Sequence, residues 1–323
     1  MVLIVTNRQD FTADFLIIEL RRRGARYARF NSEDYPQRAT LTWRIVARDV
    51  EGTLILPRTV VRTTDLVSVW FRRPVPPFVA PELRDEAARE FAFTESEAAL
   101  HGLWRTLKCC WVSHPDRLQH AESKLRQLQV ASALGLTVPT TIVTSNPSDA
   151  LAFWEEHSAS VVFKPLRRSR LERGNKETLI YTNPVPREAA DCFDQVRYAP
   201  SMLQEYVHKH LEIRVTVVGQ QVFAAAIDSQ GREDSRHDWR RGDSSKLPHY
   251  PHKLPGEVEA KCIALVHSLG LAFGAIDLVL TPSGDYVFLE INPNGQWAWI
   301  QQKCPSLRIR ESLADLLMAG GNA

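Results

Sequence analysis

The stretch that most constrains this chain is residues 275–299, AIDLVLTPSGDYVFLEINPNGQWAW, in which apolar residues alternate with polar ones. Pro, Ser and Gly at 282–284 interrupt the alternation, and this composition predicts a tight turn between two strands. If residues 282–285 form the loop, Asp277 lies directly opposite Glu290. Side chains alternate along a strand, so Asn292 shares their face. The same register pairs Thr281 with Tyr286 and directs Leu278, Leu289 and Ile291 toward a core.

Two carboxylates that face each other across strands repel, at a cost of about 3 kcal/mol for a separation of ~5 Å and an effective dielectric of ~20. A cation between them would remove that cost. The carboxylates of Asp277 and Glu290 and the amide oxygen of Asn292 are hard oxygen ligands, which suit Mg²⁺. The hairpin is therefore predicted to carry a magnesium site. The alternative is an ordinary surface hairpin with unrelated acids.

The composition bounds the class of protein. The chain has 323 residues, enough for two or three domains, and its 44% hydrophobic and 24% charged content are typical of a soluble globular protein. A net charge of +2 gives no argument for nucleic acid as a partner. The N-terminus lacks the features of a signal peptide, and no apolar run approaches the ~20 residues of a membrane span. Five cysteines without metal-ligand spacing fit free thiols in a reducing cytoplasm.

Residues 1–115 are predicted to form a first α/β domain. After a buried N-terminal strand, the helical spacing of Phe11, Phe15 and Ile18 predicts a helix at 11–23, and a long helix at 81–108 places Phe91 on its inner side. No G-x-G-x-x-G follows the first strand, so a dinucleotide site is not supported.

Residues 116–200 are predicted to form a second, smaller domain. Its first helix, at 116–134, carries Lys124, and a strand at 160–164 ends on Lys164. A lysine that continues an apolar strand is seldom left without an anion, so Lys164 is a candidate phosphate ligand. The alternative is a strand-end lysine whose ammonium simply reaches solvent. The arginine-rich loop that follows is predicted to be a mobile flap over an anionic ligand, the alternative being a solvated loop.

Residues 201–323 are predicted to form the third domain, which is built on antiparallel strands. A hairpin at 211–228 turns at Gly219-Gln220. Glu212 and Arg214 share one face of its first strand, where they either bind a ligand or form a cross-strand ion pair.

Polar residues run through the second and third domains in this order: Lys124, Lys164, Gln204-Glu205-Tyr206-Val207, Glu212, Arg214, Asp277, Glu290 and Asn292. Together they resemble the ATP-grasp superfamily, whose pattern is two lysines on a small central domain, a strand-end acid with a hinge, and an Asp, Glu, Asn metal set on two late strands. The resemblance covers the whole chain. It implies an α/β (α+β) ATP-grasp fold with an N-terminal pre-ATP-grasp α/β domain, a small central domain and a C-terminal antiparallel-sheet domain.

A narrower resemblance is to the ATP-grasp peptide ligases that mature microviridin-like ribosomal peptides, the graspetides. The segments that carry it are VWFRRP (69–74), ALHGLWRTL (99–107), WVSHP (111–115), HDWRR (237–241) and FLEINPNGQWAW (288–299). It implies a macrocyclase that uses ATP and Mg²⁺ to phosphorylate Asp or Glu side chains of a ribosomal precursor peptide, composed of a leader and an acidic core. Thr or Ser then closes an ω-ester ring, or Lys an ω-amide ring. The arginine-rich flap departs from the glycine-rich loop of many ATP-grasp proteins.

The resemblance also implies roles for the candidate residues. Lys124 and Lys164 would bind the α- and β-phosphates of ATP as point charges, and Mg²⁺ would bridge the β- and γ-phosphates. Arg214 and Arg240 would stabilise the transferring phosphoryl group together with Lys164. The remaining nucleotide ligands would be Gln204, the hinge Glu205, Tyr206 and Val207 for adenine, and Glu212 for the ribose.

A substrate that carries carboxylates needs a positively charged lining. The arginines expected to contact the peptide are Arg72, Arg73, Arg167, Arg168, Arg170, Arg236 and Arg241. For Arg72 and Arg73 the alternative is a solvated strand end. The leader is expected to lie against the hairpin at 211–228 and the connection at 229–241. Trp297 and Trp299 either wall the peptide groove or belong to the core.

Two other functions stay open at this point. One is an ATP-grasp ligase that adds free amino acids to a protein tail or a small acid. The other is a non-catalytic module that binds nucleotide or peptide, against which the intact Asp, Glu, Asn set argues. The resemblance also allows a homodimer, and neither a nucleic acid nor a membrane is expected as a partner.

Overall fold

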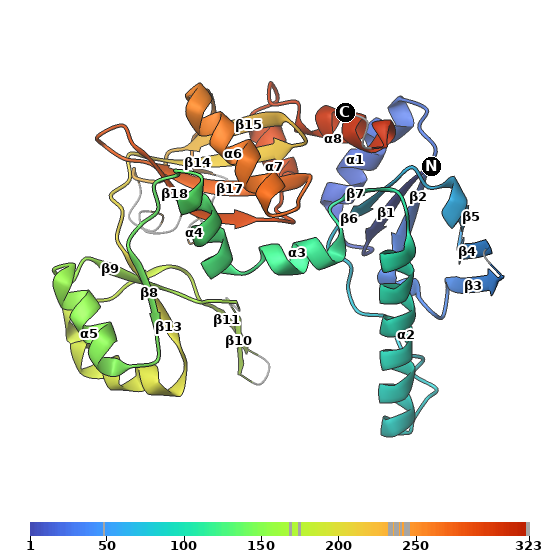
Figure 1. Ribbon diagram of the computed structural model, residues 1–323, viewed down its shortest axis with the longest axis horizontal. Coiled ribbons are helices and arrows are strands. Elements are labelled where there is room, and N and C mark those ends of the chain that lie inside the picture. Colours follow the sequence, from blue (N-terminus) through green and yellow to red (C-terminus); the bar gives the residue numbers. More distant parts are fainter. Residues whose placement is uncertain are drawn as a thin grey trace.

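The computed structural model describes residues 1–47, 49–167, 170–173, 176–231, 235, 239, 241 and 246–320. The chain forms three lobes that follow each other along the sequence (Figure 1). Helix α3 (Pro115–Ala121) runs from the N-terminal lobe toward the C-terminal lobe. The central lobe lies below the C-terminal sheet in the view of Figure 1. The predicted α/β architecture, with an N-terminal α/β domain and a C-terminal antiparallel sheet, is confirmed.

The N-terminal lobe is built on a parallel four-stranded sheet of order β2-β1-β6-β7. Its elements are β1 (Val2–Thr6), α1 (Phe11–Arg22), β2 (Tyr27–Asn31), β6 (Ser68–Phe71) and β7 (Cys110–Val112). Asp10 caps α1, because its side chain accepts hydrogen bonds from backbone N–H groups of the first helical turn. The apolar spacing that predicted α1 does not mark its buried face, because Phe11 is 81% exposed and α1 packs through Leu16 and Leu20.

A second, antiparallel sheet and a long helix complete this lobe. They are β3 (Thr40–Val46), β4 (Asp49–Leu56), β5 (Thr59–Arg62) and α2 (Glu86–Thr106). Helix α2 begins later than predicted, and Phe91 is 69% exposed rather than inward. The helix projects beyond the sheet (Figure 1), so only its last part, at Leu100, Leu103 and Trp104, reaches the core.

The predicted helix at 116–134 is two helices, α3 and α4 (Lys124–Ala133). The chain breaks at Ser123, which adopts extended backbone angles and precedes the first turn of α4. Lys124 therefore begins a helix instead of lying within one. This break lets α4 pack on the C-terminal sheet, where Leu128 and Ala131 join its core.

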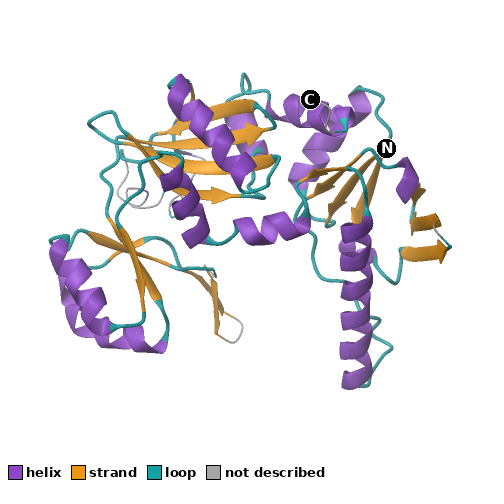
Figure 2. Ribbon diagram, in the orientation of Figure 1, coloured by secondary structure: helices purple, strands orange, loops and turns teal. Residues whose placement is uncertain are grey.

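The central lobe is an antiparallel sheet of order β12-β9-β13-β8, covered by helices on one side (Figure 2). Its elements are β8 (Thr141–Thr144), α5 (Pro147–Glu156), β9 (Val161–Lys164), β12 (Asn183–Pro184), the 3-10 helix η3 (Arg187–Tyr198) and β13 (Ser201–Glu205). A separate hairpin, β10 (Arg170–Arg173) and β11 (Lys176–Leu179), occupies the place of the predicted flap.

The C-terminal lobe is an antiparallel five-stranded sheet of order β16-β15-β14-β17-β18. Its elements are β14 (Leu211–Val218), β15 (Gln221–Ile227), β16 (His249–His252), α6 (Gly256–Ser268), β17 (Phe273–Leu280), β18 (Tyr286–Asn292), α7 (Ala298–Lys303) and α8 (Ile309–Ala319). The turn between β14 and β15 falls at Gly219-Gln220 as predicted, and Gly219 has a φ of 57°. Within the described ranges, no helix combines the length and apolarity that crossing a bilayer requires.

The hairpin β17–β18 confirms the key pairing of the sequence analysis, because Asp277 lies opposite Glu290. Near the turn the predicted register is wrong, since Leu280 rather than Thr281 pairs with Tyr286. The register shifts between Asp277 and Leu278, and this bulge restores the predicted pairing farther along. Its consequence is a changed direction for Leu289, which lines a cavity while Phe288 takes the core position.

Candidate functional site

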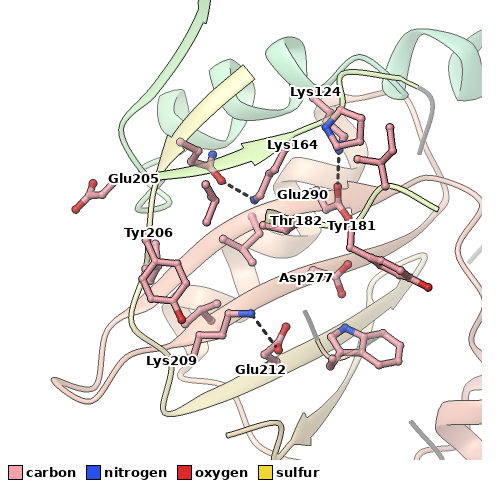
Figure 3. A pocket seen from close by; sticks show the side chains of 18 of the residues that line it. Lys124, Lys164, Tyr181, Thr182, Glu205, Tyr206, Lys209, Glu212, Asp277 and Glu290 are labelled. Carbon is pink, nitrogen blue, oxygen red and sulfur yellow. Dashed lines mark hydrogen bonds and ion pairs between the residues drawn. The ribbon is translucent and has the colours of Figure 1, made fainter. Parts of the chain in front are cut away.

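A cavity of about 430 Å³ lies between the central lobe and the C-terminal sheet. Figure 3 shows side chains from both lobes pointing into it. Its lining includes the predicted site residues Lys124, Lys164, Arg167, Gln204, Glu205, Tyr206, Val207, Glu212, Asp277, Glu290 and Asn292. It also includes residues that the sequence analysis did not assign to the site: Val162, Pro165, Ile180, Tyr181, Thr182, Lys209, Trp239, Val279 and Leu289.

One edge of the cavity carries the predicted metal ligands. Asp277 and Glu290 face each other from paired strands, and Asn292 lines the same cavity. Arg214 Nη1 donates to Asp277 Oδ1 at 2.8 Å, and Lys124 Nζ lies 3.2 Å from Glu290 Oε2. The repulsion between the two carboxylates is thus relieved by cations of the protein itself, so it does not by itself demand a metal ion.

The donor set nevertheless fits a hard divalent cation. Two carboxylates and one amide oxygen on one face match the ligands that Mg²⁺ takes in nucleotide sites, where waters and phosphates complete its shell. Across the described ranges, no group of three or more His, Cys, Asp or Glu side chains is arranged so that it could hold a metal ion. A metal here would therefore depend on this mixed set.

Gln127, which the sequence analysis missed, fastens α4 to β18. Its amide donates to the Ile291 carbonyl at 2.9 Å and accepts from the Ile291 N–H at 3.1 Å. The side chain is only 3% exposed. Since Ile291 lies between Glu290 and Asn292, this double hydrogen bond holds the start of α4, and with it Lys124, against the metal edge. The sequence carried no signal for this role, because it depends on the packing of α4 against β18.

Lys164 ends β9 at the cavity wall, as its place in the sequence predicted. Its ammonium donates to Gln204 Oε1 at 2.5 Å, and Gln204 Nε2 donates to Thr141 Oγ1 at 2.9 Å. Lys164 is 8% exposed, so the hydrogen bond compensates part of the burial of its charge. An anion entering the cavity would meet a cation already fixed in direction.

The predicted hinge follows β13. The N–H of Tyr206 donates to the Ser160 carbonyl at 2.9 Å, and the Glu205 carboxylate accepts from Thr140 Oγ1 at 3.1 Å. These contacts fix the chain where it passes from the central to the C-terminal lobe. Val207 continues along the cavity wall.

Glu212 lies at the cavity end nearest this hinge (Figure 3). Its carboxylate lies 3.1 Å from Lys209 Nζ and accepts from Ser229 Oγ at 2.8 Å. Of the two alternatives for this face, the cross-strand ion pair forms for Arg214, which pairs with Asp277 of the neighbouring strand, whereas Glu212 pairs with Lys209. Lys209, three positions before Glu212, also belongs to the site. The sequence did not reveal this role, because Lys209 is a lone lysine in a polar connection.

The remaining arginines have diverse surroundings. Arg167 lines the cavity, and the exposed Arg241 donates to Asn183 Oδ1 with its guanidinium 5.7 Å from the centre of the Tyr181 ring. Arg170 belongs to β10. Arg168, Arg236 and Arg240 lie outside the described residues.

Arg72 and Arg73 lie at the end of β6. Arg72 is 1% exposed, with Nη1 2.5 Å from the Asn294 carbonyl and Nε 3.4 Å from Asp10 Oδ2. Burial lowers the pKa of Arg72 to about 10. Arg72 therefore supports the loop after β18, whereas the neighbouring residue Arg73 is exposed.

The two tryptophans of the segment 288–299 lie in different surroundings. Trp297 is fully buried in a core shared by the N- and C-terminal lobes. Trp299 packs its ring 5.0 Å from Trp239, which lines the cavity, and 5.4 Å from His249. Trp297 thus belongs to the core.

Two lobes that close on a cavity with two lysines, an interlobe hinge and paired acids define an ATP-grasp ligase. Residues 1–119 match the MvdD pre-ATP grasp domain, and residues 121–314 match the RimK-like ATP-grasp domain. The chain belongs to the RimK-like ATP-grasp family.

Two solved structures are similar to this chain over nearly its full length. The chain is 30% identical to a Chryseobacterium gregarium RiPP-associated ATP-grasp ligase in complex with ADP and a leader and core peptide, with a TM-score of 0.92 over 98% of this chain and 96% of that one. It is also 30% identical to the macrocyclase MdnC bound with precursor peptide MdnA from Microcystis aeruginosa MRC, with a TM-score of 0.86 over 98% and 99%. The resemblance to graspetide-type ligases is thus confirmed.

Curated relatives match over a shorter stretch. A probable alpha-L-glutamate ligase of Xylella fastidiosa (strain M12) is 25% identical over 182 residues, which are 55% of this chain and 57% of that protein. One of Pseudoalteromonas translucida (strain TAC 125) is 28% identical over 184 residues, 56% and 58%. The chain spans somewhat more than half the length of the curated relatives it matches.

Proposed function

We propose that this chain is an ATP-dependent peptide macrocyclase that acts on Asp or Glu side chains of a ribosomal precursor peptide. The observation that carries the proposal is the single cavity that gathers Lys124, Lys164 and the Asp277–Glu290–Asn292 edge. Supporting it, two ligases similar over almost the whole chain were solved with leader, core or precursor peptides.

The chemistry explains why ATP is needed. A carboxylate is a poor electrophile, because its leaving group would be oxide. A carboxylate oxygen therefore attacks the γ-phosphorus, the bond to the β-phosphate oxygen breaks, and ADP leaves. A Thr or Ser hydroxyl, or a Lys amine, then attacks the acyl carbon and gives up a proton as phosphate departs. Each ring forms with net loss of one water, and phosphoryl transfer itself requires mainly positioning and charge neutralisation.

The phosphate end of the cavity supplies that positioning. Lys164, fixed by Gln204, and Lys124, at the start of α4, are the cations for the α- and β-phosphates. Arg214 neutralises charge on the transferring group. Asp277 and Glu290, with Asn292, would hold Mg²⁺, which when bound supplies further neutralisation of the β- and γ-phosphates.

The hinge end receives the nucleoside. The backbone of Glu205–Val207 would hydrogen-bond the adenine, and Glu212 would accept from the ribose hydroxyls. Lys209 Nζ, 3.1 Å from the Glu212 carboxylate, pairs with it at this end of the cavity. The exposed Arg167, Arg241 and Arg73 are proposed to meet the acidic peptide.

The proposed setting follows from the same resemblance. The five cysteines form no disulfide in the structure, which suits a reducing cytoplasm where ATP is abundant. A homodimer is the proposed assembly. The leader is proposed to lie against the β14–β15 hairpin and the connection that follows it.

The decisive experiment uses a precursor peptide whose core carries Asp or Glu together with Thr, Ser or Lys. With Mg·ATP, we expect ADP and a product lighter than the precursor by one water per ring, measured by mass spectrometry. Glu290→Gln and Lys164→Ala should each abolish ADP formation while circular dichroism stays that of the wild type. ADP formation without any loss of water mass would rule out cyclisation.

The similarity to alpha-L-glutamate ligases favours one alternative, the addition of free glutamate to an acceptor. The same assay separates the two reactions, because amino-acid addition increases the mass of the acceptor. Glutamate-dependent ADP formation together with such a gain would replace the proposed cyclisation.

A further inference from the structure

Residues 292–295 form a tight turn directly after the predicted metal ligands of β18. The Gly295 N–H donates to the Asn292 carbonyl at 3.1 Å, which closes a β-turn with Pro293 and Asn294 at its two central positions. Proline fixes one backbone dihedral of this turn and restricts the residue before it to extended conformations. Pro293 and Gly295 are also buried. Asn294 is therefore linked to the predicted metal ligand Asn292 through a short and rigid piece of chain.

The N-terminal lobe holds Asn294 through both its backbone and its side chain. Arg72 Nη1 donates to the Asn294 carbonyl at 2.5 Å and to Asn294 Oδ1 at 3.2 Å. Asn294 Nδ2 in turn donates to the Phe71 carbonyl at 3.0 Å, and Arg73 Nε donates to the Asn294 carbonyl at 3.3 Å. The side-chain amide of Asn294 thus both donates and accepts across the boundary between the N- and C-terminal lobes.

Within the described part of the chain, the Arg72 guanidinium makes its hydrogen bonds to Asn294. Arg72 is 1% exposed, and its Nε and Nη2 atoms are buried without a hydrogen-bond partner. Its Nε lies 3.4 Å from Asp10 Oδ2, and this carboxylate accepts from Thr6 Oγ1 at 2.9 Å and from the Thr12 N–H at 3.0 Å. Burying a charge is costly unless it is paired and hydrogen-bonded. Asp10 therefore compensates the charge of Arg72, and Asn294 receives its hydrogen bonds.

These contacts lie where an open parallel sheet commonly binds a ligand. In the order β2-β1-β6-β7, the chain continues from β1 toward one side of the sheet and from β6 toward the other. Ligands of open α/β sheets bind in the crevice at the carboxyl ends of two such strands. Asn294 contacts Phe71, the last residue of β6, and Arg72 joins it to Asp10, which follows the end of β1. At this crevice the N-terminal lobe therefore binds a turn of its own chain.

We infer that Asn294 is a positioning residue for the proposed metal site: the N-terminal lobe holds Asn294, and the turn thereby fixes the Asn292 amide at the cavity. This inference rests on the proposed function and adds the part that the N-terminal lobe takes in it. Asp277 and Glu290 lie within paired strands, whereas Asn292 is the last residue of β18, where the ladder ends. The anchored turn supplies the constraint that the sheet no longer gives beyond this point.

The test measures binding of Mn²⁺ to the full chain saturated with ADP, by electron paramagnetic resonance of the free ion. Mn²⁺ takes the same oxygen ligands as Mg²⁺, and the measurement needs no turnover. Asn294→Ala should weaken Mn²⁺ binding about tenfold, as expected for the loss of a group that orients a metal ligand. Asn294→Ser, which keeps a shorter hydrogen-bonding side chain, should lie between Asn294→Ala and the wild type.

Asn31→Ala is the matched control. Asn31 also donates and accepts within the N-terminal lobe, to Asp34 Oδ2 at 3.1 Å and from Arg29 Nε at 2.8 Å, but these contacts do not involve the turn. Its replacement should lower the midpoint of urea unfolding about as much as Asn294→Ala does, because each removes a comparable set of hydrogen bonds. Mn²⁺ affinity of Asn31→Ala should equal that of the wild type. A matching loss of Mn²⁺ affinity in Asn31→Ala would show a general effect of destabilisation and overturn the inference.

A double-mutant cycle separates positioning from a merely structural role. If Asn294 acts through Asn292, adding Asn294→Ala to Asn292→Ala should change Mn²⁺ affinity by less than about twofold. Equal losses in both backgrounds would overturn the inference, as would wild-type affinity in Asn294→Ala or no Mn²⁺ binding to the wild type. If the Mn²⁺ results are as expected but the wild type forms no ring from a precursor, the positioning role stands and the proposed cyclisation fails.

Discussion

Each carboxylate of the predicted metal set has a cation of the protein beside it. Lys124 lies 3.2 Å from Glu290, and Arg214 lies 2.8 Å from Asp277. These pairs balance the charges of the apo site. Mg·ATP bound at this proposed site would offer new partners to both members of each pair, because a metal ion attracts carboxylates and phosphates attract lysine and arginine. Binding of metal and nucleotide should therefore be mutually dependent.

Replacing Lys124 with Met tests this exchange. Nucleotide binding should weaken about tenfold, since a hydrogen bond to a charged group contributes roughly 1.5 kcal/mol or more. Affinity for Mg²⁺ without nucleotide should rise, because Glu290 loses its competing cation. Titration calorimetry with Mg²⁺ alone and with Mg·ADP measures both effects. Lys261→Met, which removes a lysine 2.5 Å from Glu257 on α6, is the control. Unchanged Mg²⁺ affinity in Lys124→Met would contradict the exchange.

Gly295 is predicted to be indispensable because a side chain has no room there. A Cβ would lie 2.9 Å from Arg214 Nη2 and 3.2 Å from Asn292 Cβ, and it would clash with Ala275. Gly295→Ala should therefore displace the arginine or the metal ligand. We expect a loss of about 1–3 kcal/mol in the free energy of unfolding and a large fall in kcat.

The matched control for Gly295→Ala is Gly102→Ala in α2. A Cβ at Gly102 meets no atom within 4 Å. That substitution should stabilise the protein by up to about 1 kcal/mol, because alanine favours the helix, and should leave kcat unchanged. Urea unfolding and steady-state kinetics measure both variants. Equal behaviour of the two would show that the loop tolerates a side chain.

At the scale of elements, the sequence could predict the part of the site that depends on the alternation of side chains along a strand. The facing of Asp277 and Glu290 follows from the parity of two strands about a turn. The bulge was not predictable, because the loop is one residue longer than assumed and the bulge compensates for it. The longer loop and the bulge compensate each other, so the pairing at Asp277 is as predicted. Their effect is seen at Leu289, which lines the cavity.

Other errors have a common physical cause, since a sequence pattern does not say where a partner surface ends. Helix α2 continues beyond the sheet that it covers, so Phe91 is exposed although its spacing matches the inner face. Gln127 and Lys209 belong to the site through contacts with strands distant in the sequence. Their roles depend on the packing of α4 on β18 and on the chain path after the hinge, and local composition records neither.

The contact between α1 and α8 predicts a pH dependence of stability. Glu19, 1% exposed, accepts from Arg22 and Arg23 and lies 3.9 Å from Arg310 of α8. Hydrogen bonds, first that from Arg22, lower the pKa of Glu19 from 4.5 to about 2. A lowered carboxyl pKa means that its stabilising contribution is complete above the unfolded-state value and is lost as the pH falls toward the folded-state value.

Glu19→Gln should therefore reduce the free energy of unfolding by about 2–3 kcal/mol near neutral pH. The difference from the wild type should shrink as the pH falls from about 5 toward about 2. Urea unfolding at a series of pH values measures this difference. Glu257→Gln, on the exposed face of α6, should change little at any pH. A difference that stays constant with pH would show that the charge of Glu19 does not matter.

For the whole molecule, the core clusters divide the chain differently from its three lobes. One cluster contains Val2 and Trp70 of the N-terminal sheet together with Trp297 and Leu313 of the C-terminal lobe. Among the described residues, the buried members of the central-lobe cluster lie between Ala150 and Leu203, while Met202 of the same lobe joins the cluster of the C-terminal sheet. The N- and C-terminal lobes should therefore unfold as one cooperative unit, and the central lobe separately and first, because its core is the smallest.

Calorimetry of the apo protein should then resolve two transitions. Phe153→Ala, in the central core, should lower only the first, and Leu313→Ala only the second, each by the about 2–5 kcal/mol expected for a large-to-small core change. Mg·ADP bound in the cavity would contact residues of both lobes, so at about 100 times its Kd it should stabilise the complex by about 2.7 kcal/mol and bring the transitions together. A single transition that Phe153→Ala shifts as a whole would mean that the hinge transmits unfolding between lobes, and the central lobe could not then close on nucleotide as an independent body.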